Sequence, residues 1–519
     1  MQTLSKSQPS SIVFTFLLSC FVVLVLFIWQ GHTGFSMADE GYLWYGSQRT
    51  LLGDIPIRDF MAYDPGRYYW CAALMKVVGS NGIMAVRAAV AVFQVLGLAT
   101  GILVIARGSK ASVPLCLITA VILALWMFPR HKLFDITLSL WLVGALTYLV
   151  ASPSTLRYLL LGAIVGLAAV FGRNHGVYGV AGSLLGMAYL AISREDRRSV
   201  VQGFLVWCVG VFIGYLPVLL MLLAVPGFSH AFLADILFLI GIKTTNLPLP
   251  VPWPWDVSLH DRARIWVFRD LMVGAAFLLL PLCGVLVIAY LALSRFLRRE
   301  VSPALVASGC FILPYAHYAF SRADIGHLAL GIFPLLLSML ALAATVPSAM
   351  KWIFAGLLLI ASTVIMLPVH PGWQCHETGD CLEVDVAGDR LLLDRSTASD
   401  VTLLQRLDHD FASGGKSIVA TPFWPGAYPL LERKSPVWEI YALSPYRSVD
   451  FQRDEIARIA AASPGFVIVV DAALDGRDEL RFHNTHPLTA RFFSEHFDRV
   501  SGYSDNPDYW IFKSKSAAK

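Results

Sequence analysis

The stretch 33-TGFSMADEGYLWYGSQRTLLGDIPIRDFMAYDPG-66 decides how this chain is interpreted. It directly follows an apolar run, residues 12–30, that is long enough to cross a bilayer. Two adjacent carboxylates, Asp39 and Glu40, lie near its start, and Arg58, Asp64 and Arg67 follow. Because ionisable residues at membrane depth are costly, they indicate a function by default. The stretch therefore predicts a polar site at the end of a membrane helix.

The composition excludes a soluble enzyme. The chain has 519 residues, of which 56% are hydrophobic and 15% charged, whereas soluble domains carry roughly 25% charged residues. The mean hydropathy is +0.63. A net charge of +4 is small for this length and gives no support to nucleic-acid binding. These values predict a polytopic membrane protein.

Apolar runs of about 17 to 25 residues are candidate membrane helices, and we identify about eleven of them. The first also ends near Ser36-Met37-Ala38, which loosely fits a signal-peptide cleavage site, but its apolar core is too long and only Lys6 precedes it. We therefore favour an uncleaved helix. The expected spans are 12–30, 88–106, 112–128, 136–151, 158–172, 176–193, 200–224, 271–293, 302–319, 328–346 and 352–368.

Basic residues in the short loops predict the orientation of these spans. They all fall on one side, which the positive-inside rule assigns to the cytoplasm. With the N-terminus cytoplasmic, an odd number of crossings leaves residues 369–519 outside, which in a bacterium is the periplasm. The protein is thus expected to be a multi-pass protein of the bacterial inner membrane. The basic residues are Arg107, Lys110, Arg157, Arg194, Arg197, Arg198, Arg295, Arg298, Arg299 and Lys351.

Residues 369–519 differ in composition from the rest of the chain. Strand-like runs at 416–421, 465–470 and 509–513 and a helix-like run at 453–462 predict a small periplasmic α/β domain after a membrane domain spanning 1–368. The tail contains no nucleotide-binding glycine loop, catalytic triad or metal-ligand spacing. Cys375 and Cys381 would be able to form a small disulfide loop in an oxidising compartment.

Three short loops on the predicted outer side are basic, although the orientation rule favours the opposite. Interfacial snorkelling or salt bridges at helix ends would explain any one of them. Because three loops share the feature and face the same compartment as Asp39, we expect them to bind substrate. Their residues are Arg130, His131 and Lys132 in the first loop, Arg173 and His175 in the second, and Arg322, Asp324 and His327 in the third.

A carboxylate beside several cations at the outer membrane surface fits a lipid-linked phosphosugar. Phosphate favours arginine, whose planar fork bonds two oxygens, with Lys or His as further donors. A carboxylate at hydrogen-bond distance can remove the proton of an acceptor hydroxyl. Charge that develops on the departing phosphate must also be stabilised. Together these groups describe glycosyl transfer.

The first external loop, about 31–87, is too long for a simple connector. Its segments 42–52 and 68–78 are expected to be interfacial helices, joined by turns at Gly53–Pro56 and Asp64–Gly66. Such a loop would hold Asp39, Arg58, Asp64 and Arg67 in fixed positions. Asp39 would act as the general base and Glu40 would support it; alternatively, Asp39 is a helix cap.

The order of these motifs resembles a known superfamily. A first membrane helix, an Asp-Glu pair at its outer end, then Gly53-x-x-Pro56-x-Arg58-Asp59-Phe60, Asp64-Pro65-Gly66 and a later Arg322-x-Asp324-x-x-His327 are similar to the GT-C membrane glycosyltransferases. The resemblance is to the bacterial branch that includes relatives of protein O-mannosyltransferases and the lipid A aminoarabinose transferase. It covers about residues 1–368.

The resemblance implies an inverting transfer of a sugar from a polyprenyl-phosphate donor to a glycan, lipid or protein acceptor. By position, Asp39 takes the family's catalytic acidic site, and Arg58 and Arg322 would contact the donor. The second external loop offers only Asp135 where relatives carry a second acidic motif. One isolated carboxylate is a poor divalent-cation site, so no cofactor is expected and a metal is not supported.

Two other classes of function share some of these features. A transporter or flippase of lipid-linked sugars would also need a basic cavity, but it would not need a carboxylate base, and the chain shows no half-to-half repeat. A non-catalytic assembly protein of the cell envelope would use the tail for docking. Segment 226–268, with Trp253-Pro254-Trp255, would serve as a lid, an acceptor-binding loop or an interface anchor.

Overall fold

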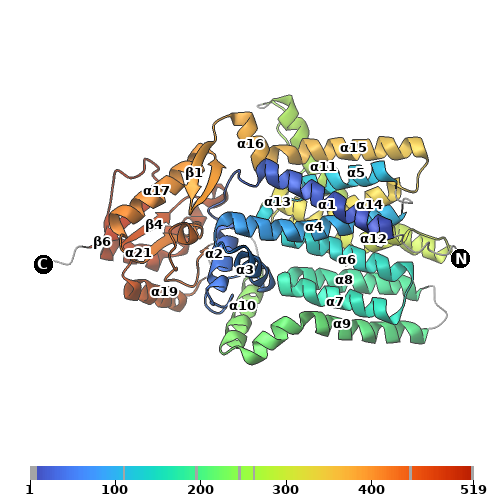
Figure 1. The fold of residues 1–519 in the computed structure, drawn as a ribbon, viewed down its shortest axis with the longest axis horizontal. Coiled ribbons are helices and arrows are strands. Elements are labelled where there is room, and N and C mark those ends of the chain that lie inside the picture. The colour runs from blue at the N-terminus through green and yellow to red at the C-terminus, as the bar shows by residue number, and fades with distance from the viewer. Residues whose placement is uncertain are drawn as a thin grey trace. The chain divides into compact units, whose positions relative to one another are not determined.

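Figure 1 shows the fold in a computed structural model, which describes residues 9–108, 112–192, 197–243, 247–260, 263–442 and 447–515. Lys110 and Arg194, used above for orientation, lie outside the described residues. The chain divides into two compact units. The first comprises Met1–Ile28, Val90–Ser229 and Lys243–Trp373, and the second comprises Trp29–Ala89, His230–Ile242 and Gln374–Lys519.

The first unit is helical, and every expected apolar run forms a helix. Among the described residues, 7 helices are long and apolar enough to cross a membrane, or up to 8 if a bent pair counts as one span. The number of crossings therefore stays a prediction. The helices at the expected runs are α1 (Pro9–Gln30), α4 (Ile83–Gly108), α5 (Val113–Trp126), α6 (Leu133–Ala151), α7 (Thr155–Phe171), α8 (Arg173–Ala191), α9 (Arg197–Ala224), α11 (Arg264–Phe296), α12 (Pro303–Ser321), α13 (Ile325–Gly331) with α14 (Phe333–Ala343), and α15 (Ser348–Met366).

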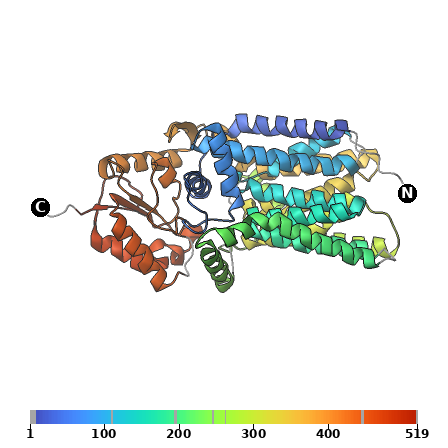
Figure 2. The same ribbon diagram turned by 60° about the horizontal axis from the view of Figure 1, so that its bottom comes forward.

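Helix α12 lies at the centre of this unit and packs against α6, α8, α11, α13 and α14. Figure 2 shows α7, α8 and α9 running side by side. Helices α7 and α9 approach closely because each presents two glycines, Gly162 and Gly166 facing Gly210 and Gly214: a Cβ on Gly162 would lie 2.1 Å from the Trp207 carbonyl oxygen. Small residues at such spacing allow tight helix packing in a membrane.

Several observed helix boundaries differ from the approximate predicted ones, including those of the helices next to the three basic loops. Helix α6 begins at Leu133 and α8 at Arg173, so Arg173 and His175 lie in the first turn of a helix. The run 328–346 begins earlier and is broken into α13 and α14, which are bent by 54°. The physical reason is that backbone hydrogen bonds of these helices continue through the polar residues, which hydropathy alone treats as loop. Segment 226–268 also contains a helix, α10 (Phe228–Ile242).

The second unit combines the predicted external loop with strands and helices from the end of the chain. The loop carries α2 (Asp39–Leu51) and α3 (Gly66–Val78), close to the two predicted helices. All three predicted strands and the predicted helix of the tail are present. The tail contains α16 (Pro371–Thr378, shared with the first unit), β1 (Leu382–Val386), β2 (Asp389–Leu393), α17 (Arg395–Phe411), β3 (Ile418–Thr421), α18 (Ala427–Leu430), α19 (Val449–Ala462), β4 (Phe466–Val470), α20 (Phe482–Thr485), α21 (Pro487–His496), β5 (Phe497–Arg499) and β6 (Tyr509–Ser514).

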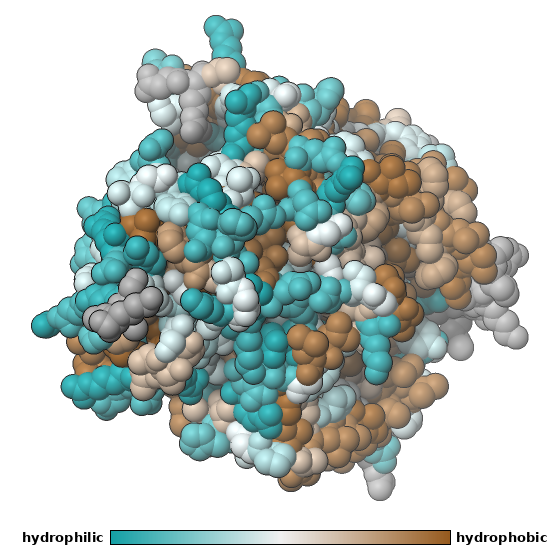
Figure 3. All heavy atoms as spheres, turned by 60° about the vertical axis from the view of Figure 1, so that its left-hand side comes forward, coloured by the Kyte–Doolittle hydropathy of each residue, from teal (hydrophilic) through white to brown (hydrophobic). Residues whose placement is uncertain are grey.

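Strands β3 to β6 form one four-stranded sheet in the order β3-β4-β6-β5, and β1 and β2 form a hairpin. Strand β4 pairs parallel with β3 and antiparallel with β6. All five of its residues are buried, which explains its unbroken apolar sequence. The face in Figure 3, on the side where Figure 1 labels β4 and β6, carries many hydrophilic residues between hydrophobic ones.

Cys375 and Cys381 are joined by a disulfide. The sequence had left this pairing open. The domain boundary predicted between residues 368 and 369 stays a prediction, because the compact second unit also contains residues 29–89 and 230–242.

Candidate functional site

Asp39 is the first residue of α2 rather than its cap. The residue before it, Ala38, is the N-cap and makes no side-chain capping bond, while the Asp39 backbone N–H donates to Ser36 Oγ at 3.0 Å. The Asp39 carboxylate is half-buried and accepts a hydrogen bond from the Tyr441 hydroxyl, with 3.3 Å between the oxygens. The first turn of a helix also favours a negative charge. These features hold the carboxylate at a fixed place.

Glu40, the next residue, has a different environment. Its side chain is 6% exposed and forms a bidentate pair with Arg87, whose Nε and Nη2 each lie 2.7 Å from a carboxylate oxygen. Arg87 also donates to the carbonyl oxygens of Gly31 and Gly34, both at 2.6 Å. Arg87 thereby ties the start of the loop, α2 and the start of α4 together. This geometry favours a structural role for Glu40; its catalytic role stays a prediction.

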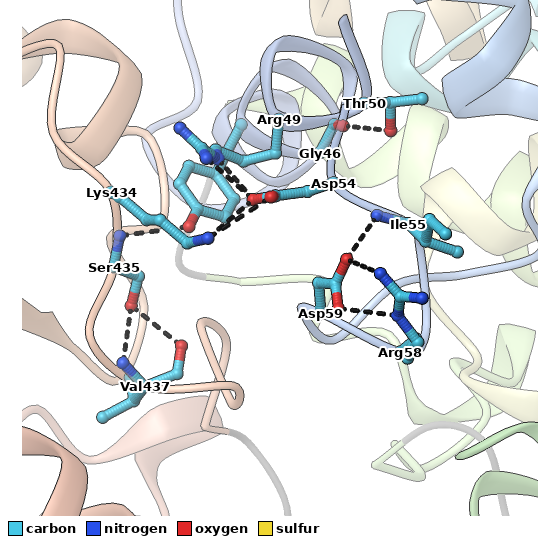
Figure 4. A network of polar contacts seen from close by, with 11 residues as sticks. Gly46, Arg49, Thr50, Asp54, Ile55, Arg58, Asp59, Lys434, Ser435 and Val437 are labelled. Carbon is cyan, nitrogen blue, oxygen red and sulfur yellow. Dashed lines mark hydrogen bonds and ion pairs between the residues drawn. The ribbon is translucent and has the colours of Figure 1, made fainter. Parts of the chain in front are cut away.

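Arg58 lies in the turn between α2 and α3, paired with its neighbour Asp59. Figure 4 shows Nε and Nη2 of Arg58 facing the two oxygens of Asp59, each at 2.8 Å. Asp59 also accepts from the Ile55 backbone N–H at 2.8 Å. The hydrogen bonds that Arg58 donates to Asp59 raise the pKa of Arg58 and lower the pKa of Asp59. The guanidinium is therefore held charged and in one orientation, with about a third of the side chain exposed.

Asp64 and Arg67 border the start of α3. Both are buried, at 7% and 3% exposed. The Arg67 guanidinium lies over the Tyr63 ring, 5.1 Å from its centre, a contact that stabilises a desolvated cation. The structure thus places both residues inside the folded loop. Their predicted part in substrate binding stays a prediction.

The first unit brings together residues from two of the predicted basic loops. His175 Nε2 lies 2.8 Å from Asp135 Oδ1, and His175 Nδ1 lies 2.7 Å from the Tyr315 hydroxyl. The side chains of His175 and Asp135 are 1% and 3% exposed. These two hydrogen bonds link α6, α8 and α12. Its burial favours a structural role for His175, whose part in substrate binding stays a prediction.

The third predicted motif folds onto itself. Arg322 Nε donates to Asp324 Oδ2 at 2.9 Å, and its Nη1 donates to the Leu247 carbonyl oxygen at 3.0 Å. Asp324 is the N-cap of α13 and accepts from the backbone N–H of His327 at 2.8 Å and from its Nδ1 at 2.9 Å. The spacing Arg-x-Asp-x-x-His therefore builds a helix cap. Arg130, His131 and Lys132 form a short 3-10 helix and are partly exposed.

The first unit also contains an open cavity of about 370 Å³ beside Trp253 of segment 226–268. Trp253 and Trp255 stack beside each other there, with ring centres 5.3 Å apart. The cavity is lined by Pro252, Trp253, Asp256, Val257, Ser258, Asp270 and Val273.

Within the described ranges, no group of three or more His, Cys, Asp or Glu side chains is arranged to hold a metal ion. Two residues beside Asp39 and Glu40 were not predicted from the sequence: Arg87, which pairs with Glu40, and Tyr441, which donates to Asp39. A charged residue bordering the apolar run 88–106 was a signal for Arg87. No local pattern indicated Tyr441, because its contact with Asp39 spans 402 residues.

Comparisons with known proteins find relatives by structure alone. No protein-family model matches the chain, and no curated protein matches it. The solved structure of ArnT from Cupriavidus metallidurans bound to undecaprenyl phosphate matches with a TM-score of 0.57 at 14% identity, covering 96% of this chain and 97% of that one. The apo state of the same ArnT matches with a TM-score of 0.54, with equal identity and coverage.

The apo oligosaccharyltransferase of Archaeoglobus fulgidus matches with a TM-score of 0.53 at 12% identity, covering 96% of this chain and 74% of that one. ArnT, the lipid A aminoarabinose transferase, and this oligosaccharyltransferase both belong to the GT-C superfamily. The resemblance predicted from the motifs is therefore confirmed at the level of the fold.

Proposed function

We propose that this GT-C-fold protein is an inverting glycosyltransferase that moves a sugar from a polyprenyl-phosphate-linked donor to an acceptor hydroxyl at the periplasmic face of the inner membrane. The observation that carries the proposal is the environment of Asp39. Its carboxylate is half-buried at the first turn of α2, while the neighbouring Glu40 is committed to Arg87. The fold shared with ArnT, whose structure contains undecaprenyl phosphate, supports the choice of donor.

Asp39 acts as the general base. Its carboxylate takes the proton of the acceptor hydroxyl, the acceptor oxygen forms a bond to the anomeric carbon, and the bond from that carbon to the donor phosphate breaks. One displacement from the face opposite the phosphate inverts the configuration. The pairing of Glu40 with Arg87 supports this assignment, because Arg87 engages both carboxylate oxygens of Glu40, whereas Asp39 accepts from the neutral Tyr441 hydroxyl.

Arg58 binds the donor phosphate. Its side chain is about one third exposed, and Asp59 keeps it charged and oriented. A guanidinium held in this way supplies charge-assisted hydrogen bonds where negative charge develops on the leaving phosphate. Arg322, which is held by Asp324 and the Leu247 carbonyl, is the second proposed donor contact.

The proposed location follows from charge and from the disulfide. The assignment of the basic loops to the cytoplasm, together with the predicted odd number of crossings, supports a periplasmic location for residues 369–519. The disulfide between Cys375 and Cys381 supports an oxidising compartment for that segment. The transferred sugar is a hexose or pentose, and the acceptor is a glycan, a lipid or a protein.

The test is release of the lipid carrier by the purified full-length protein. Undecaprenyl-phosphate hexoses and pentoses are supplied in detergent with a crude cell-envelope extract as acceptor, and free undecaprenyl phosphate is quantified. The proposal expects release from at least one donor, dependent on the extract, and loss of release in Asp39→Asn. A flippase or an assembly protein would leave every donor intact, and that result would refute the transferase.

A further inference from the structure

The segment Arg433–Tyr441, from the part of the chain after β3, runs along the loop that carries Asp39. Lys434 Nζ lies 3.1 Å from Asp54 Oδ2, and the Ser435 backbone N–H donates to the Tyr45 hydroxyl at 3.1 Å. Figure 4 shows Lys434 and Ser435 beside Arg49 and Asp54. The two segments are therefore joined by side chains of both.

Trp438 continues the same contact with backbone partners. Its indole N–H donates to the Ile57 carbonyl oxygen at 2.9 Å, and its carbonyl oxygen accepts from the Met61 backbone N–H at 2.8 Å. Each of these bonds fixes the segment relative to the turn that holds Arg58. Three residues further on, the segment reaches Asp39.

A second contact packs the start of α2 against the tail of the chain. Gly41 lies against Gly426 so closely that a Cβ on Gly41 would be 2.5 Å from the Gly426 Cα atom, and the Gly426 N–H donates to the Met37 carbonyl oxygen at 2.9 Å. The backbone on both sides of Asp39 is thus packed directly against the tail of the chain. A tail residue can therefore hold the Asp39 carboxylate with little freedom.

Tyr441 is the residue that makes this contact. Its ring packs against Tyr42, with ring centres 5.6 Å apart, and Tyr42 packs in turn against Tyr63 at 4.9 Å. The Tyr42 ring is 3% exposed, so it forms a rigid support for Tyr441. The hydroxyl then extends to Asp39 Oδ1 at 3.3 Å.

We propose that Tyr441 is a positioning residue of the transfer reaction, which orients the Asp39 carboxylate through its hydroxyl and makes the tail of the chain part of the active site. This inference rests on the proposed function of Asp39 as the base. The hydrogen bond that the Tyr441 hydroxyl donates to Oδ1 fixes the rotation of the Asp39 carboxylate relative to the acceptor hydroxyl. Without the hydroxyl, the carboxylate rotates and meets the acceptor in the productive orientation less often.

The test compares Tyr441→Phe with a matched variant, Tyr45→Phe, in the full-length protein. Both changes remove one tyrosine hydroxyl from the contact between the tail and the loop, but only Tyr441 touches Asp39. Tyr45 is 1% exposed, and its loss leaves the Ser435 N–H without its acceptor. Tyr45→Phe should therefore lower the melting temperature at least as much as Tyr441→Phe does.

The expected result is a separation of kcat from KM. Tyr441→Phe should lower kcat for undecaprenyl-phosphate release about tenfold, the size of one lost hydrogen bond to a charged group, with KM for the donor unchanged. Tyr45→Phe should keep the wild-type kcat. A wild-type kcat in Tyr441→Phe, or an equal loss of kcat in both variants, would overturn the positioning role.

Asp39→Asn, measured alongside, separates this inference from the proposed function. If Asp39→Asn is inactive while Tyr441→Phe turns over at the wild-type rate, only the role of Tyr441 is refuted. If Asp39→Asn turns over at the wild-type rate, or the wild type releases no lipid phosphate from any donor, the proposed function is refuted and the role of Tyr441 is refuted with it.

Discussion

The chain carries polar residues of interest in two regions that differ in how those residues are paired. In the loop 31–87, Arg58 pairs with an adjacent residue and is about one third exposed, and Asp39 is half-buried. Among helices α6, α8 and α12, the Asp135–His175 pair bridges different helices and is almost completely buried. Both regions produced the same signal in the sequence, a charge next to an apolar run.

The difference shows that a charge at a helix end has two physical explanations. A buried polar group must be hydrogen-bonded to offset its desolvation, so a side chain such as His175 serves packing between helices. A partly exposed charged side chain with a local partner is held in one orientation, and its exposed part can still bind a ligand. Both situations occur in the dipeptide Asp39-Glu40. Glu40 is buried and paired with Arg87, whereas Asp39 is only half-buried.

The largest loss of stability is expected at the buried pair between Glu40 and Arg87. Arg87→Met would leave the Glu40 carboxylate and the carbonyl oxygens of Gly31 and Gly34 without the guanidinium. Breaking a buried ion pair costs about 3–5 kcal/mol, so the variant should melt far below the wild type in detergent. The double variant Glu40→Leu/Arg87→Met should recover part of the loss; an unchanged melting temperature in the single variant would show that the pair is not structural.

A smaller loss of stability is expected from Asp135→Asn in the helical region. The change keeps the shape but removes the charge that His175 Nε2 faces at 2.8 Å. Losing a charged hydrogen bond costs about 1.5–3 kcal/mol. If the comparison of the two regions is right, the melting temperature falls and the KM for the donor does not change. A higher KM at wild-type stability would move this pair into the binding site.

Arg58→Lys tests the loop 31–87, where we expect donor binding to change rather than stability. A lysine keeps the charge but cannot reproduce the planar fork, so donor binding should weaken about tenfold with little change in melting temperature. Arg49→Lys is the matched control, because Arg49 pairs with Asp54 in the same loop and is not assigned to the donor. Equal donor affinity in the wild type and Arg58→Lys would remove Arg58 from the site.

The smallest effect concerns Asp400, a half-buried carboxylate of α17 that accepts a hydrogen bond from the Tyr509 hydroxyl at 3.0 Å. Burial raises the pKa of Asp400 to about 6. A carboxyl whose pKa is raised on folding stabilises the fold below its unfolded pKa, and this stabilisation is lost as the pH rises through 6. The melting temperature of Asp400→Asn relative to the wild type should therefore increase between pH 4 and pH 7. A difference that does not vary with pH would contradict this.

The sequence predicted the fold better than the site. Apolar runs are long and their signal is local, so every expected helix forms. The strand β4 was also evident, because five consecutive apolar residues with three valines favour a buried strand. The contact between Tyr441 and Asp39 was not predictable in this way, since it depends on the packing of segments 402 residues apart. The motif Arg322-x-Asp324-x-x-His327 was found, but its spacing suits a helix cap as well as a ligand site.

The central claim is that Asp39, and not Glu40, is the base. The most direct measurement is a single-turnover reaction of the full-length protein with an undecaprenyl-phosphate sugar, in which donor binding and lipid-phosphate release are followed separately for Asp39→Asn and Glu40→Gln. We expect Asp39→Asn to bind the donor and to release no lipid phosphate, because the amide cannot accept the proton. Glu40→Gln should release it at a measurable rate. Release by Asp39→Asn at the wild-type rate would show that Asp39 is not the base.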